Sequence, residues 1–142
     1  MNEPETIREI LENTKTMAVV GLSDNPGRPS FGVAKFMQRQ GYRILPVNPQ
    51  MRIVLGETSY PTLEDAWNAS GKTIDLVNVF RAPEHVPEIV RDVIRLKIAR
   101  LWLQEGVIHV QAAAEAEAAG IRVVMGHCIL KERMAAGWRT II

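Results

Sequence analysis

The sequence is poor in cysteine, in net charge and in long apolar runs. Cys128 is the only cysteine among the 142 residues, so no disulfide can form within the chain, which suits a reducing compartment. The formal net charge of +1 argues against a general nucleic-acid coat or an anionic-membrane binder. No apolar run approaches the roughly 20 residues that cross a bilayer, and residues 1–5 lack the features of a secretory signal. We therefore expect a cytoplasmic protein whose partners are neither nucleic acids nor membranes.

Length and composition indicate one globular domain over residues 1–142. A chain of this length can bury a sizeable core and is short for two typical domains. Hydrophobic residues make up 46% of the chain and charged residues 23%, which are ordinary values for a globular domain.

Apolar strand-like runs alternate with amphipathic helical patterns along the chain. The predicted strands cover residues 17–21, 42–47, 73–80, 100–103 and 121–125. The predicted helices cover residues 6–13, 30–40, 84–96 and 109–119, with a shorter one that Thr62 caps. The pattern allows one short extended piece at 52–55 and assigns no element after residue 125. It predicts an α/β fold with a doubly wound, parallel sheet of about five strands and helices on both faces.

The stretch from residue 17 to residue 35 is the strongest functional signal. A buried strand ends at Gly21, and a helix begins near Ser30 after a loop rich in Gly, Ser, Asn and Pro. The first amides of a helix and the positive end of its dipole favour anions, and Arg28 adds a positive charge to this loop. The loop therefore predicts a phosphate-bearing ligand, although Gly21 and Ser30 could instead serve only a tight turn and a helix cap.

The exits of the predicted strands are the first places to look for further contacts. In parallel α/β sheets the ligand lies across the carboxyl ends of the strands, where strand order reverses. The corresponding residues here are 21–23, 46–48, 80–81, 103–106 and 126–128. Arg81, at the third exit, could face a ligand or pair with Glu84 or Glu105.

Two common phosphate-binding motifs are missing from the loop. A dinucleotide fingerprint would place glycines where Ser23 and Pro26 stand, and an acidic residue after the second strand, where the chain reads Asn48-Pro49. The lysine loop of P-loop NTPases is also absent. These departures count against NAD and leave a loop that suits a pyrophosphate or a terminal phosphate, because arginine binds phosphate through a planar fork.

Several motifs occur in the order and spacing of one family. They are Val20–Pro26 with Arg28–Ser30, then Pro46–Pro49, Val79–Arg81, Leu101–Gly106 and Val124–Ile129. Together they resemble the small CoA-binding proteins, stand-alone relatives of the CoA-binding domain of the succinyl-CoA synthetase alpha subunit. The resemblance covers roughly residues 5 to 133 and implies a Rossmann-like domain with coenzyme A across the strand ends. It also implies that the diphosphate lies on the Gly21–Ser30 loop and that the adenine lies near the second and third strand exits.

The resemblance implies contacts from four loops and assigns no catalytic or metal-binding residue. The implied contacts are Gly21, Leu22, Ser23, Arg28 and Ser30, then Val47, Asn48 and Pro49, then Phe80, Arg81 and Val86, and finally Gln104 and Glu105. The synthetase subunit has a lysine after its second strand, for which Arg52 is the substitute here. The chain carries no counterpart of the synthetase's phosphohistidine domain, so the ligase reaction does not follow from the resemblance.

The leading hypothesis is a non-catalytic protein that binds CoA or an acyl-CoA. One alternative is an acyl-CoA-utilising or thiol-dependent enzyme that uses Cys128, although a buried, inert thiol is the favoured interpretation of that residue. A second alternative is a module for NAD or another nucleotide. We expect Trp102 and Trp138 in the core, and we expect the Ile141-Ile142 end to pack on a second copy in a homo-oligomer.

Overall fold

The computed structural model of the chain describes residues 1–137 and contains a five-stranded parallel sheet. The strands of the sheet are β1 (Thr16–Val20), β2 (Arg43–Val47), β5 (Leu76–Val79), β6 (Arg100–Leu103) and β7 (Arg122–Met125). Their order is β2-β1-β5-β6-β7, so the direction in which strands are added reverses between β1 and β5. The expectations for Trp138 and for Ile141-Ile142 lie outside the described residues.

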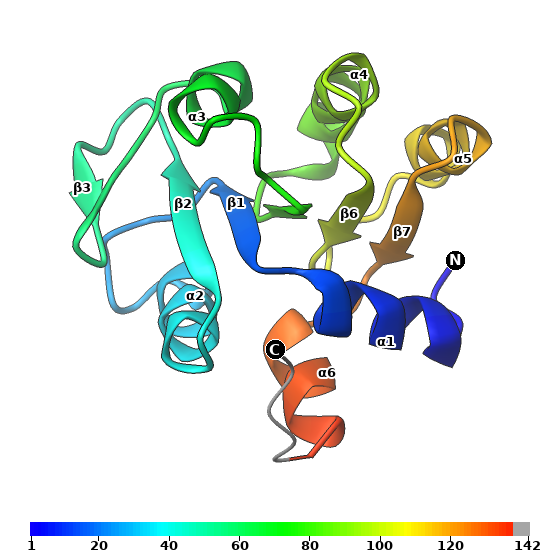
Figure 1. Cartoon of the computed structure of the whole chain (residues 1–142), viewed down its shortest axis with the longest axis horizontal. Coiled ribbons are helices and arrows are strands. Elements are labelled where there is room, and N and C mark those ends of the chain that lie inside the picture. Colours follow the sequence, from blue (N-terminus) through cyan, green and yellow to red (C-terminus); the bar gives the residue numbers. More distant parts are fainter. Residues whose placement is uncertain (138–142) are drawn as a thin grey trace.

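Three helices cover each face of the sheet (Figure 1). One face carries α1 (Pro4–Asn13), α2 (Pro29–Arg39) and α6 (Ile129–Ala135), and the other carries α3 (Leu63–Ala69), α4 (Val86–Arg95) and α5 (Val110–Ala118). Alternate residues of β1 point to opposite faces: Met17 and Val19 join the core under α1 and α2, whereas Ala18 and Val20 join the other core. All five residues of β1 are buried, as expected for a strand covered on both sides. These observations confirm the predicted doubly wound α/β fold.

The largest departures from the predicted elements are at three places. The strand predicted at 73–80 begins only at Leu76, because the Asp75 carboxylate accepts hydrogen bonds from the amides of Lys15 and Thr16 and so ends the preceding loop. The segment from 53 to 58 forms a small antiparallel pair, β3 (Ile53–Val54) and β4 (Glu57–Thr58), where one extended piece was expected. Helix α6 lies in the part of the chain to which the pattern assigned no element.

Two other predicted features agree closely with the structure. The Thr62 hydroxyl oxygen accepts a hydrogen bond from the Asp65 amide at 3.1 Å and so caps α3 as predicted. The helix predicted at 84–96 is present as a short 3₁₀ turn, Pro83–His85, followed by α4.

A charge cluster ties α1 to the amino end of the sheet. The Arg100 guanidinium donates from Nε to Glu9 Oε1 at 3.0 Å and from Nη2 to Glu9 Oε2 at 2.8 Å. The two side chains are only 15% and 21% exposed, and Arg122 Nη1 lies 3.1 Å from the same carboxylate. These hydrogen bonds, chiefly the one from Arg100, hold the pKa of Glu9 below its usual value, although burial acts in the opposite direction.

We expect Glu9→Gln to lower the free energy of unfolding by about 1–2 kcal/mol at pH 7, since a bidentate, largely buried pair is lost. Because the folded-state pKa of Glu9 is depressed, its contribution is complete above the unfolded value of about 4.3 and disappears as the pH falls through the folded-state value. The gap between wild type and Glu9→Gln in urea denaturation should therefore be largest at pH 6–7 and shrink toward pH 3.

Glu12→Gln is the matched control, because it removes an exposed pair with Arg8 on the same helix. It should cost at most about 0.5 kcal/mol. A Glu9→Gln gap that stays constant from pH 7 to pH 3 would contradict the assigned role of the carboxylate.

Candidate functional site

The strand exits form one row along the carboxyl edge of the sheet. The register aligns Val20 of β1 with Val47 and Val79, Val79 with Leu103, and Leu103 with Met125. The next residue of each strand therefore begins an exit, and these residues are Gly21, Asn48, Phe80, Gln104 and Gly126. The reversal of strand order falls between the exits of β1 and β5, where ligands bind in sheets of this type.

Gly21 makes the turn at which the β1 exit meets β2 on one side and the β5 exit on the other. Its amide donates to the Val47 carbonyl at 2.8 Å, and its φ is +88°. A Cβ at this position would lie 2.4 Å from the Phe80 carbonyl oxygen, which is closer than a side chain allows. The backbones of the β1 and β5 exits can approach this closely only because residue 21 has no side chain.

The loop from Gly21 to Ser30 is held by its own side chains. The Ser30 hydroxyl oxygen accepts from the Ser23 amide at 3.1 Å, and the Ser23 hydroxyl oxygen accepts from the Asn25 amide at 3.0 Å. Asn25 Oδ1 in turn accepts from the Gly27 amide at 2.9 Å. Arg28 occupies the N-cap position of α2, and within residues 1–137 its side chain makes no capping hydrogen bond. The loop thus presents an uncapped helix N-terminus next to an arginine, an arrangement that favours anions.

Asn48 fastens the β2 exit to this loop. Its Nδ2 donates to the Leu22 carbonyl at 3.0 Å, and its Oδ1 accepts from the Gln50 amide at 3.0 Å. The backbone of Asn48 also donates to the Tyr60 carbonyl at 2.9 Å. Both polar atoms of the side chain are therefore engaged within the protein.

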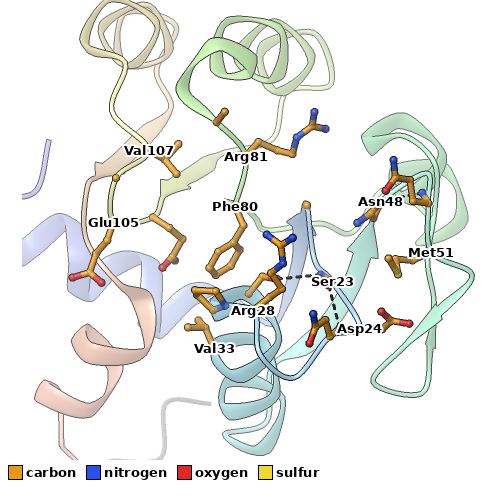
Figure 2. Close-up of a pocket in the computed structure, with 18 of the residues that line it drawn as sticks. Ser23, Asp24, Arg28, Val33, Asn48, Met51, Phe80, Arg81, Glu105 and Val107 are labelled. Atoms are coloured by element: carbon orange, nitrogen blue, oxygen red, sulfur yellow. Dashed lines mark hydrogen bonds between the residues drawn. The ribbon is translucent and has the colours of Figure 1, made fainter.

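A cleft of about 900 Å³ runs along the row of exits, which is a size typical of small-molecule sites. In Figure 2, Ser23, Asn48 and Met51 lie on one side of the cleft, Glu105 and Val107 lie on the other, and Phe80 lies between them. The sequence-predicted site residues that line the cleft are Gly21, Ser23, Arg28, Ser30, Asn48, Pro49, Phe80, Arg81, Gln104 and Glu105.

The four other predicted contacts do not line this cleft. Leu22 and Val86 are fully buried in the two cores. Val47 lines a neighbouring cavity of about 350 Å³, which shares Pro49 and Arg81 with the main cleft. Arg52 is exposed and lines neither cavity.

Sequence reasoning missed part of the lining. The additional residues are Asp24, Asn25, Pro29, Val33, Gln50, Met51, Ala82, Pro83, Gly106, Val107 and Cys128. Five of them lie in stretches that the sequence had already singled out: Asp24, Asn25 and Pro29 in the Gly21–Ser30 loop, and Gly106 and Cys128 at strand exits. Another five follow a strand exit within three residues, namely Gln50, Met51, Ala82, Pro83 and Val107, so wider windows would have included them. Val33 is different, because it is the fifth residue of α2 and its position depends on how that helix packs.

Two arginines line the cleft, Arg28 and Arg81. Arg28 and Arg81 form no ion pair within residues 1–137, so the structure shows neither alternative partner predicted for Arg81. Glu105 is paired instead with Lys131 of α6, with Nζ and Oε2 3.0 Å apart. Both guanidinium groups remain available to an anionic ligand.

Cys128 and His127 point to different surroundings. Cys128 is buried as predicted, at 9% exposure, yet it also forms part of the cleft wall just before α6. His127 Nδ1 lies 3.6 Å from Glu132 Oε2, and its carbonyl accepts from the Trp102 indole at 2.9 Å. His127 does not line the cleft, and Trp102 is fully buried as expected.

Within residues 1–137, no three His, Cys, Asp or Glu side chains are arranged to hold a metal ion. None of the helices in this part of the chain has the length and apolar character to span a bilayer.

Comparison with known proteins gives one consistent result. The chain matches the family model described as CoA binding domain over residues 15–134. It is 38% identical to YneT of Bacillus subtilis (strain 168) over 123 residues, which cover 87% of this chain and 88% of YneT.

Solved structures agree with this match. A protein from Thermus thermophilus is 34% identical, with a TM-score of 0.85 and coverage of 95% of this chain and 98% of the other. A protein from Pyrococcus horikoshii OT3 is 33% identical, with a TM-score of 0.85 and coverage of 92% and 89%. The motifs along the strand exits, the fold and these matches together show that the chain belongs to the CoA-binding domain family.

Proposed function

We propose that this protein binds coenzyme A, free or acylated, along the cleft at the carboxyl edge of its sheet, and that it does so without catalysing a reaction. The observation that carries the proposal is the β1–α2 loop. There, Gly21 lets two strand exits meet and Arg28 stands beside an uncapped helix N-terminus. Membership of the CoA-binding domain family supports CoA over other phosphate-bearing ligands.

The ligand would lie along the row of exits. The diphosphate occupies the Gly21–Ser30 loop, where the α2 dipole and Arg28 favour negative charge. The adenosine lies toward β2 and β5, beside Pro49 and Arg81, which line both cavities. The pantetheine arm then runs along the row of exits, past Phe80 at the β5 exit and on toward β6 and β7.

The surroundings of Asn48 argue against NAD. In dinucleotide sites an acidic residue at this strand exit accepts hydrogen bonds from the ribose hydroxyls. Here the position holds an amide whose nitrogen donates to Leu22 and whose oxygen accepts from Gln50. Asn48 therefore lacks the negative charge with which an acidic residue binds a ribose diol, and its amide is oriented by contacts within the protein.

Titration calorimetry with CoA, dephospho-CoA, NAD and ATP tests the proposal. We expect saturable binding of CoA with a dissociation constant well below 1 mM and weaker binding of NAD. Absence of a CoA signal at millimolar ligand would refute the proposed function. Incubation with acetyl-CoA gives the second readout: the thioester should be recovered intact, and thiol release that disappears in Cys128→Ser would favour the enzymatic alternative instead.

A further inference from the structure

Two buried amide side chains lie below the cleft. Asn78, in the middle of β5, is fully buried, and Gln104, the first residue after β6, is 4% exposed and lines the cleft. Gln104 Nε2 donates a hydrogen bond to Asn78 Oδ1 at 2.7 Å. An amide pair in such a position is expensive to bury unless its polar atoms find partners.

Met17 determines which way the Asn78 amide group is oriented, and so which residue of the amide pair donates the hydrogen bond. The Asn78 side chain places Nδ2 3.9 Å from the Met17 sulfur, which is also fully buried. A thioether sulfur accepts hydrogen bonds weakly and donates none, so the nitrogen of Asn78 is the atom that belongs on that side. The Asn78 oxygen then faces Gln104 as an acceptor, so the Gln104 side chain must be oriented with its nitrogen as the donor. The hydrogen bonds that link Met17, Asn78 and Gln104 therefore fix the orientation of both amide side chains.

The remaining polar atom of Gln104 is an acceptor. Within the described chain, Gln104 Oε1 accepts no hydrogen bond, and it is not among the fully buried atoms that lack a partner. Because the residue lines the cleft, the oxygen opens into it. An acceptor in a nearly dry wall favours a ligand group that donates and penalises one that cannot.

We propose that Gln104 Oε1 accepts a hydrogen bond from an amide N–H of the pantetheine arm and so determines where along the cleft that arm is held. The inference rests on the proposed function. Strand β6 lies two strands from β1 in the sheet, so Gln104 stands about 10 Å from the β1 exit, beyond Phe80 at the β5 exit. The pantetheine arm carries two secondary amides before its terminal thiol, and Phe80 and Val107 supply apolar walls for the methylene groups between them.

Ligand analogues test this inference on the unaltered protein. In two CoA analogues, one or the other pantetheine amide is replaced by an ester, which removes the N–H donor and keeps the length of the arm. We expect one analogue to bind about 5- to 30-fold more weakly than CoA in calorimetry, because the buried oxygen loses its donor. If both analogues bind as tightly as CoA, the inference is overturned while the proposed function stands.

The variant Gln104→Met supplies the protein side of the test, because it keeps the length of the side chain and removes the acceptor. Binding of CoA should weaken by about 5- to 30-fold, and the weakened ester analogue should lose its difference from CoA. Adenosine 3′,5′-bisphosphate, which lacks the pantetheine arm, should bind wild type and variant equally. An equal loss for CoA and the bisphosphate would show a general structural role and overturn the inference.

Binding of acetyl-CoA shows whether the donor to Gln104 Oε1 is a pantetheine amide or the terminal thiol, since the sulfur of acetyl-CoA carries no hydrogen. Gln104→Met should weaken CoA and acetyl-CoA by the same factor. A loss confined to free CoA would assign the contact to the thiol and overturn the assignment to an amide. If the thermal transition shows that Gln104→Met does not fold, the binding of the two ester analogues to the wild-type protein still tests whether an amide of the pantetheine arm is the donor. Failure of wild type to bind CoA would refute the proposed function itself.

Discussion

Gly21→Ala is expected to lower the free energy of unfolding by about 3–5 kcal/mol and to abolish measurable CoA binding. The added methyl carbon would lie 2.4 Å from the Phe80 carbonyl oxygen and 3.0 Å from the Arg81 side chain. A side chain at φ +88° also costs about 1–2 kcal/mol by itself. Relief of the clash would separate the β1 and β5 exits and move both the Gly21–Ser30 loop and Arg81. Urea denaturation and calorimetry with CoA measure the two effects.

Gly120→Ala is the matched control for this substitution. Gly120 has φ +89°, almost the same backbone conformation, but a Cβ there would meet nothing within 4 Å. Gly120→Ala should therefore show only the cost of the backbone conformation, about 1–2 kcal/mol, with CoA binding retained. The difference between the two variants measures the close approach at residue 21. Equal losses of stability would show that the contact between the two exits is unimportant.

Arg28→Ala is expected to weaken CoA binding by about 1–3 kcal/mol, or roughly 5- to 150-fold, with little change in stability. Arg28 is exposed, lines the cleft, and pairs with no acidic residue within residues 1–137. Its removal therefore costs the folded protein almost nothing but takes a charge-assisted contact from the diphosphate. The loss should also diminish at high salt, because part of it is electrostatic.

Arg39→Ala is the control for Arg28→Ala. It removes the same charge from the last turn of the same helix, away from the cleft. CoA affinity should stay within about twofold of wild type, since a distant exposed charge is screened. A similar loss in both variants would indicate a general effect of net charge, and an unchanged affinity in Arg28→Ala would remove Arg28 from the site.

Local patterns predicted the elements whose ends depend on their own residues. The strand predicted at 100–103 has those bounds in the structure, and Thr62 caps α3 through a residue three positions away. The strand predicted at 73–80 is present, but its predicted start was wrong, because Asp75 accepts hydrogen bonds from the distant amides of Lys15 and Thr16. No local pattern contains such a contact.

The candidate site likewise combines features that local sequence predicts with features that depend on distant contacts. Loop residues that follow strands could be predicted to lie together, because parallel strands end at one edge. Cys128 was among the strand-exit residues expected there, but the local pattern did not predict α6, a seven-residue helix that follows Cys128 and packs through the fully buried Ile129. Short helices gain most of their stability from such packing rather than from their own sequence. Leu22 and Val86 stay predictions as ligand contacts, but their side chains face the two cores, which the local pattern did not indicate.

The side-chain hydrogen bonds of Ser23, Asn25 and Ser30 have a thermodynamic consequence. They order the Gly21–Ser30 loop before any ligand arrives, so the conformational entropy of ordering about ten residues is lost during folding and not during association. More of the favourable energy of the diphosphate contacts then appears as affinity. The encounter also needs no slow rearrangement of this loop, so association can proceed at the rate at which ligand and cleft meet in the right orientation.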